Sequence, residues 1–136
     1  EAVERWQNGC LSALDSSTDS NGEVVAVNAV AGDGGLAVAR PEGREVHTGC
    51  IRSFAYWDRQ LLESDRLLNS QTGELVPVQV TLLGQVRVRV RGDERVAARY
   101  RISGPNLQID VWYADGDWVG LEALTDGGRR LRYELQ

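Results

Sequence analysis

The sequence is notable first for the residues it lacks. Its 136 residues include no lysine and no methionine, one histidine, one phenylalanine and two cysteines. All 15 basic residues are therefore arginines, and the formal net charge is -5. An acidic total gives no general attraction to nucleic acid or anionic membranes. One histidine and two cysteines do not complete a four-ligand zinc site, so we expect no metal and no cofactor.

Long apolar runs are also missing. No stretch of about eighteen apolar residues occurs, so the sequence predicts no transmembrane segment and contains no signal peptide core. The chain starts at Glu1 and not at methionine, and we expect a segment upstream of it to be missing. Apolar residues at 42% and charged residues at 26% are typical of a globular protein. We therefore predict a single β-rich domain over residues 1–136.

Alternation of apolar and polar residues dominates the chain and indicates β-strands. Residues 1–7 and 10–16 flank Asn8-Gly9, a pair typical of two-residue hairpin turns. Further turns are predicted at Asp19-Ser20-Asn21-Gly22, Gly92-Asp93, Asp115-Gly116-Asp117 and Asp126-Gly127-Gly128. About ten or eleven strands in one sheet rarely stay flat. The predicted fold is all-β (mainly β), a curled antiparallel meander forming a half-barrel or a barrel.

One segment departs from this pattern. Phe54, Trp57 and Leu61 lie at positions i, i+3 and i+7, which is the spacing of one helical face. The sequence therefore predicts one short helix near residues 54–66, capped at its start by Asp58 or Ser53.

The aromatic residues carry the first functional hypothesis. Trp6, Phe54, Tyr56, Trp57, Trp112 and Trp118 either line an apolar ligand cavity or pack in the core. A curled sheet of this size can hold one small ligand. As ligand-binding residues we predict Phe54, Trp57, Leu61 and Trp112.

Arginines in the second half form the most distinctive surface pattern. They alternate with apolar residues at Arg87, Arg89, Arg91, Arg99 and Arg101, and again at Arg130 and Arg132. This predicts a basic face, which either resists edge pairing as a solvated surface or binds anionic lipid head groups, lipopolysaccharide or an acidic partner. No aromatic residues are interleaved with these arginines, so nucleic acid is not expected.

Catalytic constellations are weak. His47 and Cys50 lie three residues apart on a strand and therefore point to opposite faces. Asp110 and Glu122 are not marked as a catalytic pair by any motif. A calcium loop at residues 17–28 fails at its first and last ligand positions, Ser17 and Asn28. We therefore expect that the protein is not an enzyme.

Cys10 and Cys50 each follow a glycine. In an exported protein the two would form a disulfide, and in the cytosol they would be two buried thiols. We favour the disulfide.

Three parts of the chain together resemble a known family. They are residues 4–11 (ERWQNGCL), residues 53–58 (SFAYWD) with residues 66–74 (RLLNSQTGE), and residues 110–113 (DVWY) with residues 127–134 (GGRRLRYE). They resemble a family of uncharacterised exported proteins of Gram-negative bacteria, classed as a domain of unknown function. The resemblance implies a periplasmic location, supports the Cys10–Cys50 disulfide, and carries over no catalytic residues. It also implies that the full-length protein has a signal peptide and N-terminal strands that this chain lacks. A meander interrupted by a short helix is also similar to the half-barrels of periplasmic lipoprotein carriers of the LolA/LolB type.

The expected function is therefore the non-catalytic binding of a hydrophobic or amphiphilic ligand, such as a lipid, in the periplasm. The alternative is a structural or protein-interaction module of the cell envelope. That module would hold a partner through a sheet edge or through the arginine-rich face.

Overall fold

A computed structural model describes residues 1–105, 107–124 and 130–134 of the chain. The predicted turn at residues 126–128 and the side chains of Arg130 and Arg132 lie outside what is described. The described part is mainly antiparallel β-sheet, as predicted. Its contacts divide the chain into two compact units: residues 1–54 with 66–76, and residues 55–65 with 77–136. The predicted single domain, with further strands upstream, stays a prediction.

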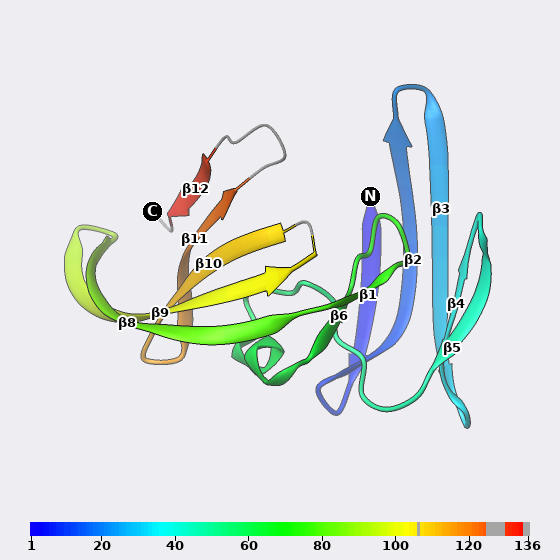
Figure 1. The fold of residues 1–136 in the computed structure, drawn as a ribbon, viewed down its shortest axis with the longest axis horizontal. Helices are drawn as coiled ribbons and strands as arrows, with labels where there is room; N and C mark the ends of the chain where they lie inside the picture. The colour runs from blue at the N-terminus through cyan, green and yellow to red at the C-terminus, as the bar shows by residue number, and fades with distance from the viewer. Residues whose placement is uncertain (106, 125–129, 135–136) are drawn as a thin grey trace. The chain divides into compact units, whose positions relative to one another are not determined.

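The first unit contains a five-stranded meander whose strands follow one another in sequence order (Figure 1). The strands are β1 (Ala2–Gln7), β2 (Cys10–Ser20), β3 (Glu23–Gly32), β4 (Gly35–Arg40) and β5 (Gly43–His47). Two of its turns, Asn8-Gly9 and Asn21-Gly22, have positive φ at both residues. Asparagine and glycine tolerate this conformation, and it matches the twist of the strands that it joins. The sequence located both turns correctly.

One face of this sheet carries the core of the first unit. Leu11, Leu14, Val27 and Val38 are at most 3% exposed. The connecting segment, residues 48–54 after β5, packs against them, because Ile51 belongs to the same buried cluster. The amide of Leu11 also donates to the carbonyl of Ile51 at 2.8 Å. The amide of Leu68 donates to the carbonyl of Arg52 at 2.9 Å. The short strands β6 (Arg66–Leu68) and β7 (Leu75–Pro77) pair beside that segment and complete the cover.

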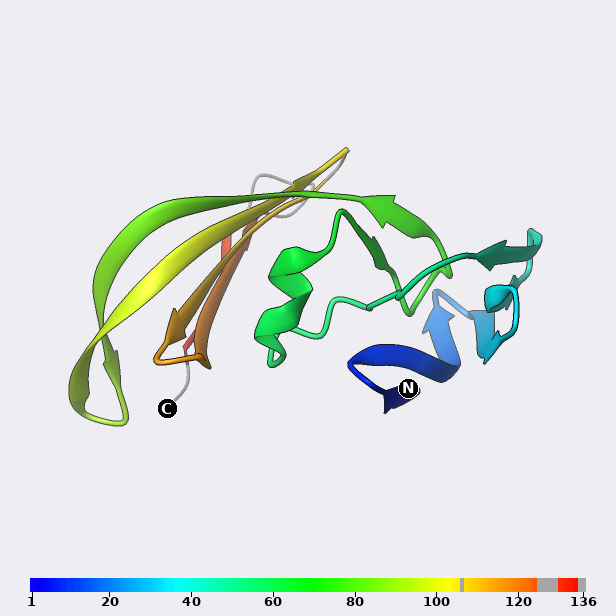
Figure 2. The same cartoon turned by 90° about the horizontal axis from the view of Figure 1, so that it is seen from below.

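The second unit contains another five-stranded antiparallel meander, in the order β12-β11-β10-β9-β8. Its strands are β8 (Gln79–Val90), β9 (Asp93–Gly104), β10 (Leu107–Ala114), β11 (Asp117–Leu124) and β12 (Arg130–Glu134). The β8–β9 hairpin bends strongly along its length (Figure 2). Strand β8 has a bulge between Leu82 and Gly84, and an extra residue in one strand increases the local twist.

The predicted curled antiparallel meander is confirmed, although its strands do not form one sheet. The described strands form two five-stranded sheets and one two-stranded sheet, and neither five-stranded sheet closes into a barrel. The division falls where the chain loses its alternation, between β5 and β8. Pro77 has no amide hydrogen to donate, and it ends β7 immediately before β8 begins.

The predicted helix is shorter than its spacing indicated. It is the 3-10 helix η1 (Arg59–Glu63), and the Asp58 side chain caps it by accepting from the amide of Gln60 at 3.0 Å. Phe54 and Trp57 precede it, so they do not share a helical face with Leu61. Leu61 is the buried residue of η1, at 0% exposure.

Strand β10 is buried on both sides from Asp110 to Ala114. We call the side bearing Tyr100 and Tyr113 the tyrosine face, and the side bearing Ala97 and Trp112 the tryptophan face. The segment of residues 55–65 covers the tyrosine face, because the Tyr113 hydroxyl donates to the carbonyl of Tyr56 at 2.7 Å. Val86, Val88 and Val90 of β8 pack with Trp112 and Ala114 on the tryptophan face.

Candidate functional site

The second unit has a pocket at the end of its sheet where two hairpin turns lie. It has a volume of about 480 Å³. The lining residues are Val90, Arg91, Asp93 and Arg95 from the β8–β9 hairpin, Gly116, Asp117 and Trp118 from the β10–β11 hairpin, and Trp57. Two adjacent turns and the segment before η1 therefore supply every lining residue.

Both hairpin turns are two-residue turns with positive φ, as required for tight reversal of twisted strands. Arg91 and Gly92 have φ of 52° and 85°, and Asp115 and Gly116 have 52° and 86°. The first turn lies one residue earlier than predicted, since Asp93 already pairs with Val90. Arginine at a left-handed position is unfavourable. This explains why the sequence placed the turn at Gly92-Asp93 instead.

Two indoles form the apolar part of the pocket. Trp57 is 63% exposed, which is high for the largest apolar side chain. Trp118 is half-buried and its indole N–H donates to the carbonyl of Gly120 at 2.8 Å. Its ring lies 6.4 Å from the ring of Tyr56 at a tilt of 31°. Trp118 is therefore fixed in place, whereas Trp57 presents most of its ring to solvent.

Charged groups surround the indoles. The guanidinium of Arg95 donates to the carbonyl of Ala114 at 3.0 Å and to the Asp115 carboxylate at 3.2 Å. It also lies 3.8 Å from the carboxylate of Asp117. Because Arg95 is on β9 and its acceptors are at the β10–β11 turn, it ties the two hairpins together. Arg95 thus holds one wall of the pocket in position.

The tyrosines behind this wall are not poised for proton transfer at neutral pH. Burial raises the pKa of Tyr56 to about 12. Burial also raises the pKa of Tyr113, and the negative charge of Asp58 adds to this increase. Both hydroxyls stay protonated at neutral pH, so Tyr113 acts as a hydrogen-bond donor in the packing of the 55–65 segment.

A second hollow has a volume of about 460 Å³. Arg59, Gln60, Leu62, Glu63 and Tyr100 line it. The Arg59 guanidinium donates to the Tyr100 hydroxyl at 3.2 Å. This hollow has one aromatic ring and is lined mainly by side chains of η1, so it offers less apolar surface than the pocket at Trp57.

Of the four predicted ligand residues, Trp57 lines the first pocket, and the other three line neither of the two hollows described above. Leu61 is fully buried, and Phe54 is half-buried in the first unit. Trp112 is 5% exposed in the core of the tryptophan face, with the Arg99 guanidinium 4.9 Å above its ring. Their role as ligand contacts stays a prediction. Asp93, Arg95 and Asp117 were not predicted as site residues. Asp93 and Asp117 each follow a turn glycine, which was the available signal, and Arg95 carries no such signal.

The predicted basic face is divided by the strand register. Arg87 and Arg89 pair with Val96 and Glu94 and lie on the tyrosine face. Arg99 and Arg101 pair with Trp112 and Asp110 and lie on the opposite face. Arg91 is in the turn. A binding role for these arginines stays a prediction.

Arg99 and Arg101 have a structural partner. Both guanidiniums donate to the carboxylate of Asp110, with Arg99 Nε at 3.0 Å and Arg101 Nε at 2.8 Å. Burial opposes ionisation of Asp110, but the hydrogen bonds and positive charges of the two arginines outweigh it and lower its pKa. Asp110 is 4% exposed and ionised, and it holds β9 to β10.

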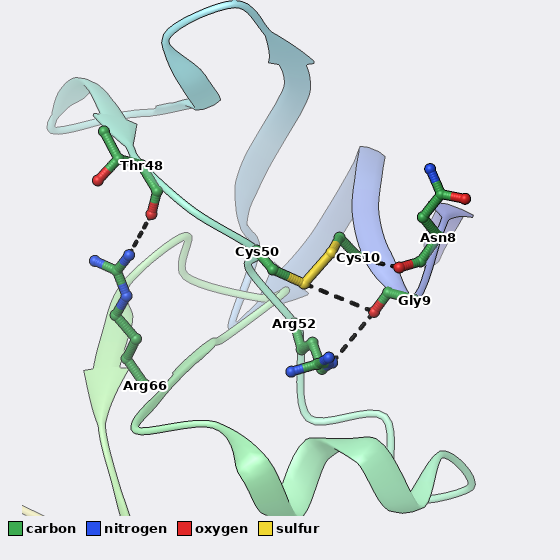
Figure 3. The surroundings of a disulfide bond; sticks show 7 residues. All are labelled: Asn8, Gly9, Cys10, Thr48, Cys50, Arg52 and Arg66. Atoms are coloured by element: carbon green, nitrogen blue, oxygen red, sulfur yellow. Dashed lines mark hydrogen bonds between the residues drawn. A yellow bond between two sulfur atoms is a disulfide. The ribbon is translucent and has the colours of Figure 1, made fainter.

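The predicted disulfide is present in the first unit (Figure 3). Cys10 at the start of β2 is joined to Cys50, 40 residues later in the chain. Arg52 Nε donates to the carbonyl of Gly9 at 3.2 Å, and the Arg66 guanidinium donates to the carbonyl of Thr48. The segment after β5 is thus attached to the β1–β2 hairpin by the disulfide and by Arg52, and to β6 by Arg66.

Within residues 1–105, 107–124 and 130–134, no cluster of three or more histidine, cysteine or acidic side chains could hold a metal ion. The imidazole Nε2 of His47 lies 3.5 Å from the carboxylate of Glu45. Cys50 is in the disulfide, so it is not a thiol partner for His47. No helix in the described part has the length and hydropathy needed to cross a bilayer.

Comparison with known proteins decides the family. All of residues 1–136 match a domain of unknown function, DUF6134. The protein belongs to this family. Searches of curated proteins and of solved structures found no match. The expected membership of an uncharacterised family is therefore confirmed, whereas export and the similarity to lipoprotein carriers stay predictions.

Proposed function

We propose that this DUF6134 protein is a periplasmic protein that binds a hydrophobic or amphiphilic ligand without catalysing a reaction. The observation that carries the proposal is Trp57, 63% exposed at the wall of a pocket of about 480 Å³. Exposing an indole to water costs free energy, and ligand sites combine aromatic surface with a few polar groups. Trp57, Trp118 and the charged residues beside them provide this combination.

The compartment is supported by the disulfide. Disulfides form and persist in oxidising compartments and are rare in the cytosol. The Cys10–Cys50 bond therefore favours an exported protein, and the family resemblance of the sequence points to the periplasm.

Native mass spectrometry of the protein, purified gently from the periplasm of its own host, tests the proposal. We expect a reproducible extra mass that solvent extraction releases. Trp57→Ala should lower the ligand-bound fraction at least about fivefold, because a ring of this size contributes about 1 kcal/mol or more to a contact. Leu82→Ala is the matched control, since Leu82 is 59% exposed in the same unit but does not line the pocket. A clean unliganded mass for the wild-type protein would refute ligand binding.

A second candidate is a protein-interaction module, and the β5 edge favours it. β5 is the last strand of the first sheet, and its residues from Gly43 to Val46 are exposed. An exposed edge can accept a further strand from another chain. Cross-linking in intact cells should then join β5 to a partner, and Val46→Lys should remove that cross-link while Trp57→Ala keeps it. Equal cross-linking of Val46→Lys and wild type would exclude the edge.

A further inference from the structure

The chemistry of the ligand can be read from the charges around Trp57 and Trp118. Besides the two indoles, the pocket is lined by Arg91, Asp93, Arg95 and Asp117. Asp115, in the same turn as Gly116, accepts from Arg95. Counting Asp115, the site holds three carboxylates and two guanidiniums, a formal charge of -1. Its charge complements a positive ligand.

The guanidinium of Arg95 is already occupied by protein acceptors. It donates to the carbonyl of Ala114 and to Asp115, and it lies 3.8 Å from Asp117. Arg91 also has a protein partner. These arginines are therefore committed to the protein and are not free to receive an anion.

The carboxylates face solvent, and Asp115 and Asp117 do so although they also pair with Arg95. The side chain of Asp117 is 75% exposed and that of Asp115 is 90% exposed. Asp93 is exposed at the pocket wall, and no hydrogen bond or ion pair links its side chain to another of the described residues. A positive group placed against Trp57 would therefore meet an acidic rim.

Indole faces attract cations. The ring quadrupole presents negative charge on its face, and tryptophan is the best aromatic residue for this interaction. The protein itself uses this contact where the Arg99 guanidinium lies 4.9 Å from the centre of the Trp112 ring. Trp57 has the same chemistry but keeps its ring exposed.

We infer that the pocket takes an alkylated ammonium group, either of a small organic cation or of a lipid head group. The inference rests on the proposed ligand-binding function and gives the ligand its chemistry. The ammonium would lie against the exposed ring of Trp57, with Asp93 and Asp117 as its counter-charges. The apolar substituents on nitrogen would contact the indoles, and a weakly hydrated cation loses little on entering such a site.

Choline and its neutral isostere 3,3-dimethylbutan-1-ol test the inference. They have the same shape and differ in charge, so their comparison isolates the cation. Binding is followed by NMR through the indole N–H signals of Trp57 and Trp118, with calorimetry for affinity. We expect choline to bind at least about tenfold more tightly than the isostere. Asp93→Asn should weaken choline severalfold without changing the isostere, and rising salt should weaken choline alone.

Variants separate the pocket from the fold. Trp57→Ala should abolish the choline response of Trp118, and Leu82→Ala should leave it intact. Trp57→Phe keeps an aromatic face and should retain part of the affinity. Trp57 is exposed, so we expect these variants to fold normally, which the unchanged dispersion of the remaining amide signals would verify.

The two sources of the ammonium are distinguished with vesicles. Sedimentation with phosphatidylcholine vesicles, lost in Trp57→Ala, assigns the site to a lipid head group. Response to choline without such sedimentation assigns it to a free cation. Equal affinity for choline and its isostere would refute the preference for a cation but not the proposed ligand binding. Absence of any response to both probes, together with an unliganded native mass, would overturn both proposals.

Discussion

Removing the Cys10–Cys50 disulfide is expected to destabilise the first unit by about 4 kcal/mol. The bond closes a loop across a sequence separation of 40 residues. In the chain-entropy description, a loop of this length removes about 13 cal/mol/K from the unfolded ensemble, which is about 4 kcal/mol at 25 °C. The loop contains β2, β3, β4 and β5, so the constraint acts on most of the sheet that Ile51 and Leu68 cover.

Amide hydrogen exchange measures this loss of stability in the strands of the first unit. In the Cys10→Ser/Cys50→Ser double variant, the slowest amides of β2 and β3 should exchange about a thousandfold faster, since each 1.4 kcal/mol is a factor of ten. Amides of β10, in the other unit, serve as the internal comparison. Reduced wild-type protein should show the same exchange rates as the double variant, because both lack the disulfide. This control separates loss of the bond from the effect of replacing the sulfur atoms.

Two results would refute the reasoning. A loss below about 1 kcal/mol would mean that the unfolded first unit is already compact and gains little from the constraint. Titration of two free thiols in denatured, unreduced protein from the periplasm would show that the bond is absent in the natural compartment. That result would also remove the main structural support for export.

Two further changes test the packing. Asp110→Asn should lower the free energy of unfolding by about 2 kcal/mol, since it leaves two guanidiniums facing a neutral amide. Asp15→Asn, at an exposed position, should change it little. Because the pKa of Asp110 is lowered in the folded protein, its contribution is complete above the unfolded carboxyl pKa of about 4 and is lost as the pH falls through the folded value. Asp110→Asn should therefore flatten the acid side of a stability–pH curve, and an unchanged curve would contradict this. Gly35→Ala should cost about 2 kcal/mol in urea unfolding, because a Cβ there would lie 2.2 Å from the carbonyl oxygen of His47 at a φ of +128°. Gly32→Ala, with nothing within 4 Å, should be nearly neutral, and equal costs for both glycines would refute the steric argument.

Local features of the structure were predictable because local chemistry produces them. Asn8-Gly9 and Asn21-Gly22 form hairpin turns because these residues adopt positive φ at low cost. Asp58 caps η1 because its carboxylate reaches an amide two residues later. The alternation of apolar residues along β8 and β9 follows from the two-residue period of a strand.

The position of the candidate site was only partly predictable. Trp57 was predicted as a ligand residue because aromatic side chains can line an apolar cavity, but the helical face expected to group it with Phe54 and Leu61 does not form. Nothing in the sequence distinguishes Phe54, Trp57 and Leu61 as ligand contacts, whereas the structure leaves Trp57 exposed and buries Leu61. Arg95 is one of fifteen arginines, and its role depends on acceptors about twenty residues away in the chain.

The sequence alone thus determined the β class, the antiparallel hairpins, the cysteine pair and the location of the one short helix. Each depends on the conformation of neighbouring residues or on simple composition. The tertiary structure decided which side of each strand is covered. The bulge between Leu82 and Gly84 moves the even-numbered residues of β8 from one face to the other: Val80 pairs with Ile102, and Val86 pairs with Ala97. A shift of one residue reverses the faces of a strand. Only the tertiary structure determines where that shift occurs, and with it the face on which Val80 and Leu82 lie.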